Sequence, residues 1–276
     1  MMQTQKILDN FKKFAENFPN YYKIKNPGFF LMTKYYIRKP TFKYLWFLFY
    51  KNPLRIITNL FLFVLPVIVK EFLKRLFLRN KKIKLYHDIS KEEVIEYFSK
   101  GEGFLTISYC QKPLNCPDGR FSSKCTANHD QCKNCFLREI KRKSQELGID
   151  FYIVLGDYDS VWNILKNQFL RRKKGAYVIT ICNMVLNVIK YLSPLFGFRG
   201  YLIPFIKGEC KTLAAYELSE FGYKNVQTDI SFENKSLLID ILQKSIQRKK
   251  ERIYRKKEEK GEFYEKELIK KFKPTL

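Results

Sequence analysis

Seven cysteines are the residues of this chain whose type and spacing best fit a chemical task. Five of them lie between positions 110 and 135, in the pattern Cys-x5-Cys-x8-Cys-x6-Cys-x2-Cys, and two more follow at positions 182 and 210. Closely spaced thiolates are ligands for zinc or for iron–sulfur clusters, and they also form disulfides. The candidate metal ligands are therefore Cys110, Cys116, Cys125, Cys132, Cys135, Cys182 and Cys210.

The cellular compartment decides between metal binding and disulfides. The first twenty residues, MMQTQKILDNFKKFAENFPN, lack the short basic region, apolar core and small-residue cleavage site of a secretory signal. We therefore expect a cytosolic chain with reduced thiols. An odd number of cysteines in a chain of 276 residues also fits metal binding or redox chemistry better than a disulfide framework.

The spacing of the cysteines favours an iron–sulfur cluster over zinc. Zinc ribbons use two close Cys pairs, and here only Cys132 and Cys135 form one. Iron–sulfur clusters commonly gather ligands from separate loops. A Cys3His zinc site from Cys125, His129, Cys132 and Cys135 is the alternative, in which His129 is equally explained as a solvated loop residue. Cys182 and Cys210 complete the site, serve a second site or form a redox pair.

The net charge of +25 is concentrated at the two ends of the chain. Residues 1–85 hold 18 Lys or Arg and 3 Asp or Glu, and residues 248–276 hold 12 and 6. The stretch between them holds 22 and 18, which is typical of an ordinary globular domain. Since nucleic-acid recognition needs basic residues beside the reading element, nucleic acid is an unexpected partner for the cysteine region.

Residues 42–78 are rich in aromatic and aliphatic side chains and predict a helical segment that associates with a membrane. The charge-free run Ile56–Val69 has 14 residues, whereas a spanning helix needs about 20. Either Arg55 and Lys70 extend the span by snorkelling, or the break at Asn52-Pro53 separates two interfacial helices. Two buried helices packed on the main domain are the alternative. Lysines and arginines between positions 70 and 84 would face an anionic cytoplasmic leaflet.

From about residue 86, short apolar runs alternate with amphipathic stretches, which predicts an α/β domain. We expect an open, mainly parallel sheet with helices on both faces, in a cysteine-rich domain over residues 86–247, between a basic, apolar segment 1–85 and a charged helix or tail 248–276. The expected strands are 103–109, 151–155, 176–181, 201–205 and 225–228. The expected helices are 91–100, 135–147, 160–170, 212–221 and 236–249, the first with a capping box at Ser90 and Glu93.

Three cysteines follow expected strands, namely Cys110, Cys182 and Cys210. The carboxyl ends of parallel strands share one edge of the sheet, where ligands bind. Gly156, Asp157 and Ser160 follow the second strand and are expected to contact a cofactor at that edge. The loop 111–134 would cover the crevice. If Cys182 and Cys210 lie away from the other cysteines, the metal site is confined to the loop and zinc becomes the stronger candidate.

The segments FLTISYC, CPDGRFSSKC, CKNC, YIVLGD, VITIC and IPFIKGEC resemble the uncharacterised cysteine-rich family catalogued as domain of unknown function 116. The resemblance covers roughly residues 100–245. It implies a metal site built from the cysteine series, a small α/β domain and an N-terminal hydrophobic segment, and it implies no known reaction. The family pattern has Gly-Gly after the second strand, where this chain has Gly156-Asp157.

These observations predict a membrane-associated cytosolic metal-binding protein, with an iron–sulfur cluster and a redox or electron-transfer accessory role. The expected partners are the cytoplasmic face of the membrane and a redox or other protein. The alternatives are a structural zinc domain that mediates protein interaction and a cysteine-dependent enzyme. No Walker-type phosphate loop and no G-x-G-x-x-G motif is present in the sequence.

Overall fold

The computed structural model describes residues 39–77, 85–155, 158–172 and 174–271. Five strands form one open sheet in the order β1-β5-β4-β2-β3. Strands β2, β3, β4 and β5 are parallel, and β1 pairs antiparallel with β5 at the edge. The strands are β1 (Tyr86–His87), β2 (Gly103–Ser108), β3 (Asp150–Val154), β4 (Gly175–Ile181) and β5 (Phe198–Pro204).

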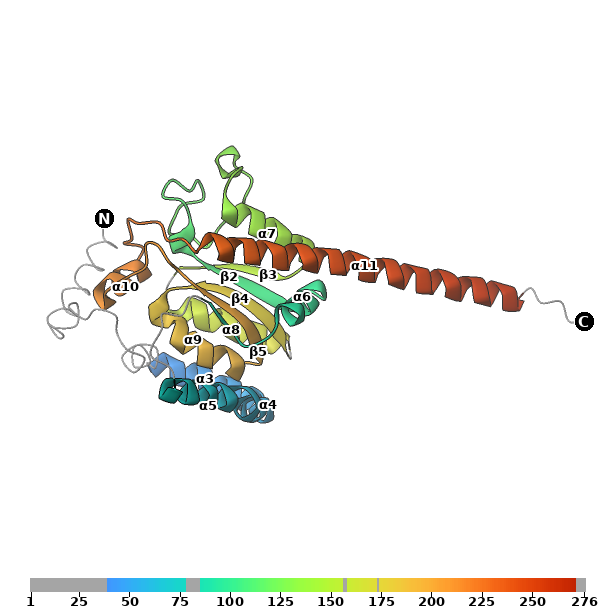
Figure 1. Cartoon of the computed structure of the whole chain (residues 1–276), viewed down its shortest axis with the longest axis horizontal. Coiled ribbons are helices and arrows are strands. Elements are labelled where there is room, and N and C mark those ends of the chain that lie inside the picture. Colours follow the sequence, from blue (N-terminus) through green and yellow to red (C-terminus); the bar gives the residue numbers. More distant parts are fainter. Residues whose placement is uncertain (1–38, 78–84, 156–157, 173, 272–276) are drawn as a thin grey trace, which may run out of the picture.

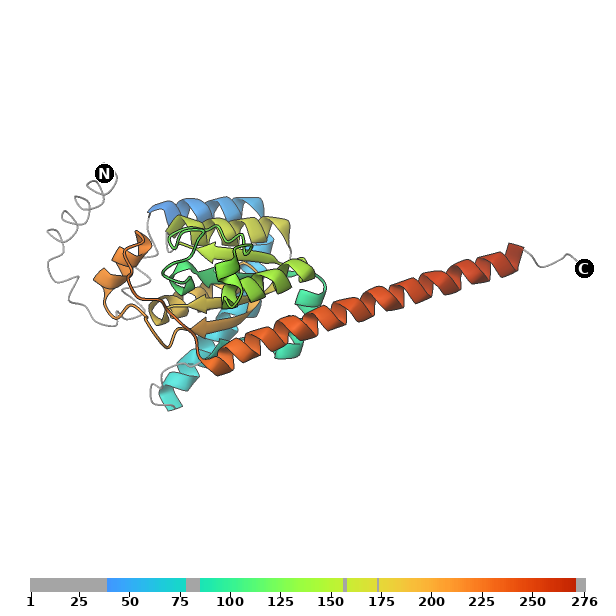
Figure 2. The ribbon, with the colours of Figure 1, turned by 90° about the horizontal axis from the view of Figure 1, so that it is seen from above.

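Helices cover both faces of the sheet, which confirms the predicted fold class (Figure 1). The helices before the sheet are α3 (Lys39–Lys51), α4 (Pro53–Asn59), the π-helix η2 (Leu60–Val64) and α5 (Leu65–Phe77). The others are α6 (Lys91–Ser99), α7 (Phe136–Leu147), α8 (Tyr158–Arg171), α9 (Asn183–Leu195), α10 (Leu213–Glu220) and α11 (Phe232–Lys271), with 3₁₀ turns η3 (Tyr109–Gln111) and η4 (Asp130–Cys132). Helix α11 runs far past the sheet in both views (Figures 1 and 2).

Neighbouring residues within each central strand supply two separate cores, because successive side chains point to opposite faces. Phe104 faces a core shared with α8 and α9, whereas Leu105 faces a core shared with α6, α7 and α11. Tyr177 and Val178 of β4 divide in the same way. All four side chains are fully buried, so the parallel strands are apolar on both faces.

Local signals in the sequence set several helix ends. The capping box is present, with the Ser90 side chain accepting from the Glu93 backbone and the Glu93 carboxylate accepting from Ser90 N–H. Helix α7 ends at Gly148, whose φ of 75° is a left-handed conformation that favours glycine. Cys135 is the N-cap of α7 and Cys182 is the N-cap of α9, so each precedes a helix.

Helices α3 to α5 form an additional layer beneath α8 and α9 (Figure 1). Tyr44 of α3 stacks on Trp162 of α8 with ring centroids 5.9 Å apart. The chain breaks at Asn52, as expected, and α4 starts with Pro53. Arg55 does not snorkel along the apolar run. Its guanidinium donates hydrogen bonds to the carbonyl oxygens of Phe169, Arg172 and Phe196 at distances of 2.7–3.0 Å.

One predicted strand is wrong, and two elements were not predicted. Residues 225–228 form no strand, and only Asp229 makes an isolated bridge to Lys207. This segment instead crosses the carboxyl edge of the sheet. Helix α9 was not predicted, and neither was the two-residue strand β1.

Candidate functional site: two cysteine clusters

The carboxyl edge of the sheet contains a cavity of about 100 Å³. Strands β2, β4 and β5 end there at Ser108, Ile181 and Pro204 because they are parallel. The chain then places Cys110 in η3, Cys182 before α9 and Cys210 in the loop after β5. All three cysteines line the cavity, together with Tyr109, Tyr216, Ser219, Lys224 and apolar side chains from α8 and α9.

The segment after α10 holds this edge in place. The backbone N–H of Thr228 donates to the carbonyl oxygen of Cys110 at 2.9 Å, and the Gln227 amide donates to the carbonyl oxygen of Gln111 at 3.0 Å. The hydroxyl of Thr180 at the end of β4 donates to the Gln111 side chain. These contacts explain why residues 225–228 are extended without pairing in the sheet.

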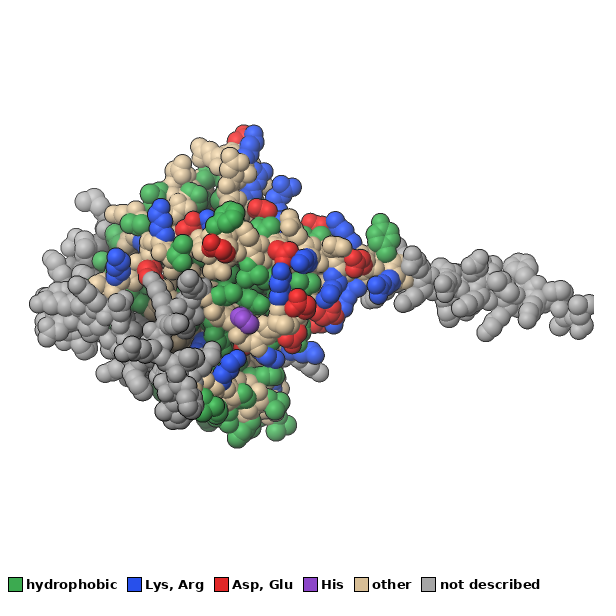
Figure 3. Space-filling model, in the orientation of Figure 1, with side chains coloured by type: hydrophobic (Ala, Val, Ile, Leu, Met, Phe, Trp, Pro, Cys, Tyr) green, Lys and Arg blue, Asp and Glu red, His purple; other side chains and the backbone are tan. Residues whose placement is uncertain are grey.

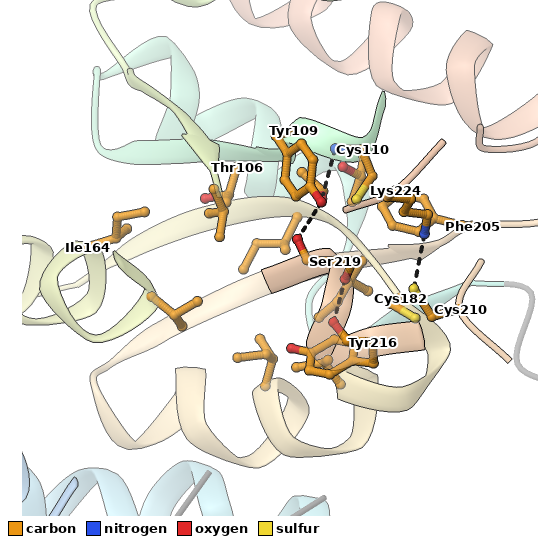
Figure 4. Close-up of a pocket in the computed structure, with 18 of the residues that line it drawn as sticks. Thr106, Tyr109, Cys110, Ile164, Cys182, Phe205, Cys210, Tyr216, Ser219 and Lys224 are labelled. Atoms are coloured by element: carbon orange, nitrogen blue, oxygen red, sulfur yellow. Dashed lines mark hydrogen bonds between the residues drawn. The ribbon is translucent and has the colours of Figure 1, made fainter. Parts of the chain in front are cut away.

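Cys182 and Cys210 lie beside each other in the cavity, and Lys224 approaches Cys210 (Figure 4). The Lys224 ammonium is 3.1 Å from Cys210 Sγ. The hydrogen bond from Cys182 and the charge of Lys224 lower the pKa of Cys210 to about 6, against the opposing effect of burial. The same hydrogen bond, with burial, raises the pKa of Cys182. Within this pair, the thiolate is therefore favoured at Cys210 and the thiol at Cys182.

The remaining four cysteines line a second, smaller cavity of about 40 Å³ within the loop between η3 and α7. Lys112 organises this loop from the inside. Its side chain is buried, and its ammonium donates to the carbonyl oxygens of Gly119, Ser122 and Lys124. The cysteines of this second cavity are Cys116, Cys125, Cys132 and Cys135.

The charges of these four thiols influence one another. Burial raises the pKa of Cys132, and the thiolate charges of Cys135 and Cys116 raise it further. Burial also raises the pKa of Cys125, with a further contribution from Cys135 against the lysines nearby. Four thiolates so close together would repel one another, and a bound cation would reverse that repulsion. The donor set therefore fits a thiolate metal centre.

The side chains are not arranged around a metal in this structure. Among the residues that the structure describes, no group of three or more His, Cys, Asp or Glu side chains is placed to hold a metal ion. His129 does not line the loop cavity, and its Nε2 lies 3.5 Å from an oxygen of Asp118. The Cys3His combination is accordingly not assembled.

The structure divides the seven candidate ligands into two groups and does not place them all around one crevice. The sheet-edge cluster is Cys110, Cys182 and Cys210, and the loop cluster is the other four. The two adjoin where Cys125 packs against Tyr109 and Cys110. The loop lies beside the sheet edge, and the crevice is lined on one side by Tyr216 and Ser219 of α10 and by Lys224 of the segment that follows it.

The other expected cofactor contacts are only partly described. Gly156 and Asp157 lie outside the described residues. Ser160 is half-buried in the first turn of α8 and lines neither cavity. Sequence reasoning missed Lys112 and Lys224. Neither lysine belongs to a motif, because each meets its partners only through the folded loop or the return of the chain after α10.

The layer α3 to α5 presents a broad apolar surface. Trp46 is 72% exposed, Leu54 79% and Phe61 61%. Figure 3 shows hydrophobic side chains gathered over this layer, at the lower edge of the molecule. Residues Pro53–Lys70 form a helical stretch of 18 residues with mean hydropathy 1.7, enough in length and composition to cross a membrane. Length and composition alone do not distinguish a spanning helix from a surface helix.

The chain was compared with protein families, curated proteins and solved structures. No family model, no curated protein and no solved structure matches it. The resemblance to domain of unknown function 116 therefore rests on the six short sequence segments alone, without a matching family model.

Proposed function

We propose that this protein is a membrane-associated, cytosolic metal-binding protein with an iron–sulfur cluster and an electron-transfer role toward a redox partner protein. The observation that carries the proposal is the gathering of four thiols, Cys116, Cys125, Cys132 and Cys135, around one small cavity. These four residues would hold the cluster. When bound, such a cluster supplies one-electron transfer.

The chain's own residues support this assignment by what they do around the cavity. Lys112 fixes the loop that contains Cys116 and Cys125 through three carbonyl groups. Cys135 is the N-cap of α7, so the start of this helix places its side chain at the cavity. All seven cysteines are free thiols, which agrees with a reducing compartment.

The membrane association is supported by the exposed apolar side of α3 to α5. Monomeric soluble proteins rarely expose a large contiguous apolar surface. This layer is fixed to the domain by Arg55 and Asn59, so its opposite side is available to a bilayer. Lys51 and Lys70 are exposed on the same layer and would contact anionic headgroups.

Anaerobic purification followed by metal analysis and visible spectroscopy tests the metal assignment. We expect brown protein with iron and sulfide in comparable amounts, and loss of both in the Cys132→Ser and Cys135→Ser variants. Cys182→Ser is the matched control and should retain the metal. Iron that persists after replacement of all four loop cysteines would contradict the proposed site.

A structural zinc domain that mediates protein interaction is the second candidate. It is favoured by the separation of Cys182 and Cys210 from the loop, since four loop thiols suffice for a closed zinc site. In that case the same preparation is colourless and contains one equivalent of zinc. This result would reject the iron–sulfur cluster while leaving the loop site intact.

A further inference from the structure

The sheet-edge cavity is a second chemical site that the loop cluster does not use. Its two closest thiols come from different elements, Cys182 from the N-terminus of α9 and Cys210 from the loop after β5. Figure 4 shows their sulfur atoms next to each other, with the Lys224 ammonium on the Cys210 side. Thiol–disulfide exchange requires an attacking thiolate and a second thiol that resolves the mixed disulfide. Two adjacent thiols, one of them beside a lysine, meet this requirement.

We propose that Cys210 and Cys182 form a dithiol site that reduces small, uncharged organic disulfides bound in this cavity. Cys210 is the attacking thiol, and Cys182 is the thiol that resolves the mixed disulfide. The assignment follows from position, because Lys224 Nζ lies 3.1 Å from Cys210 Sγ and the sulfur of Cys182 lies next to that of Cys210 (Figure 4).

The cavity selects the substrate class. Its walls include Val161, Ile164 and Leu165 of α8 and Val185 and Ile189 of α9. Lys224 is the one cationic side chain among the described residues that line it. Its volume of about 100 Å³ leaves room for a small group only. Carboxylates would lose their hydration in this cavity with a single cation to compensate, so charged disulfides are disfavoured.

The reaction has two balanced steps. The Cys210 thiolate attacks one substrate sulfur, a bond forms between the two sulfurs, and the substrate S–S bond breaks to release one thiolate, which takes a proton from water. Cys182 then loses its proton to the solvent and attacks Cys210 Sγ, and the second substrate thiolate leaves and is protonated. One disulfide is reduced to two thiols, and Cys182 and Cys210 are oxidised to a disulfide.

Two further contacts favour the second step. The backbone N–H of Met184 hydrogen-bonds Cys182, which stabilises the thiolate that must form before it attacks. The two sulfur atoms also lie next to each other in the reduced state, as the second step requires (Figure 4). An external dithiol such as dithiothreitol would return the pair to its reduced form.

The first test uses the full reduced chain and the neutral probe bis(2-hydroxyethyl) disulfide. Peptide mapping by mass spectrometry should find a Cys182–Cys210 disulfide with release of two equivalents of mercaptoethanol. Cys182→Ser should accumulate a mercaptoethanol adduct on Cys210, and Cys210→Ser should form no adduct at Cys182. Oxidised glutathione, which is charged, should react at least about tenfold more slowly. Adducts spread equally over the other cysteines would overturn the proposal.

The second test measures the alkylation rate of Cys210 by iodoacetamide against pH. Lys224→Met should reduce that rate roughly tenfold near pH 6.5, because loss of the ammonium raises the pKa of the thiol. Lys211→Met is the matched control, since Lys211 is exposed and adjacent to Cys210 in sequence, and it should leave the rate unchanged. An equal effect of both variants would contradict the assigned role of Lys224.

Metal analysis of the same variants separates this site from the loop site. Cys182→Ser and Cys210→Ser should keep the metal content of the unmodified chain. A loss of metal in either variant would show that these thiols are ligands, and it would overturn the dithiol proposal.

Discussion

Two lysines organise the two cysteine clusters in different ways. Lys112 is buried in the loop and its ammonium is held entirely by backbone carbonyl groups. Lys224 faces the cavity and interacts with a sulfur atom. A buried ammonium needs such partners, because removing a charge from water without compensation is costly. One lysine thus shapes the backbone, and the other changes the chemistry of a thiol.

The sequence was sufficient to predict the cysteines as site residues. It was not sufficient to predict that they divide into a sheet-edge cluster and a loop cluster. The spacing identified a loop group and three cysteines after strands. Whether the two sets of cysteines bind one metal centre depends on how the loop folds. Lys112 fixes the fold of the loop through its hydrogen bonds to carbonyl groups. Similarly, Cys210 and Lys224 are fourteen positions apart and meet only because α10 turns the chain back.

At Glu220 the structure predicts a pH dependence of stability. Burial raises the pKa of this carboxyl from 4.5 to about 8. The folded state therefore favours the protonated carboxyl. The contribution of this protonation to the free energy of unfolding is complete below about pH 4.5 and is lost as the pH rises through 8. Glu220→Gln, which stays neutral, should be more stable than the unmodified chain by ~3 kcal/mol at pH 9 and by much less at pH 5.

Urea unfolding at the two pH values measures this difference. Glu139→Gln, on the exposed side of α7, controls for the general effect of removing one carboxylate. A free energy of unfolding that differs between Glu220→Gln and the unmodified chain by the same amount at both pH values would contradict the prediction.

At the scale of elements, Arg55 joins three helices. Its guanidinium donates hydrogen bonds to the carbonyl oxygens of Phe169 and Arg172 near the end of α8 and of Phe196 after α9. It also stacks on the Phe169 ring at 3.9 Å. The last carbonyl groups of a helix lack partners within the helix and carry the negative end of its dipole. One side chain of α4 therefore caps two helices of the sheet domain.

Arg55→Ala should lower the free energy of unfolding by roughly 3 kcal/mol, because it leaves these carbonyl groups without their charged donor. Arg55→Lys should recover only part of this loss, since an ammonium cannot reproduce the planar fork. Urea unfolding measures both. The fluorescence of Trp162, which stacks on Tyr44, should change in Arg55→Ala if α3 and α4 separate from α8. Lys51→Ala, an exposed change on α3, is the control.

Element prediction succeeded where the sequence pattern is strong and failed where it is ambiguous. Strands β2, β4 and β5 are mostly apolar runs that are buried on both faces, and the edge strand β3 is a short apolar run that is mostly half-buried, so all four could be recognised. Helix α9 is apolar as well, with buried Met184, Val185, Leu186 and Ile189, and an apolar run of this kind does not by itself distinguish a helix from a strand. Residues 225–228 have strand-like composition, yet their hydrogen bonds go to the loops at the sheet edge.

At the scale of the whole molecule, the apolar layer α3 to α5 should bind lipid bilayers. Replacing Trp46, Leu54 and Phe61 together by Ser removes exposed apolar side chains without opening the core. We expect the unmodified chain to float with anionic vesicles and the triple variant to lose most of this binding. The circular dichroism of the variant should remain that of the unmodified chain.

A matched triple variant controls for general surface hydrophobicity. Val226, Phe232 and Tyr254 are also exposed and apolar, and they lie after α10 and on α11, away from the layer. Their replacement by Ser should leave flotation unchanged. Equal losses in the two variants would contradict a specific membrane-facing layer.

The buried Lys112 has a consequence for the order in which the loop and the metal proposed for it would assemble. The Lys112 ammonium is covalently part of the chain and cannot be removed by a chelator. Its hydrogen bonds to three carbonyl groups therefore hold the loop with or without a metal. Protein stripped of metal should then resist trypsin cleavage after Arg120, which is half-buried and donates to the carbonyl oxygens of Lys224 and Val226, whereas Lys112→Met should be cleaved there. The loop would then fold first and bind the metal afterwards.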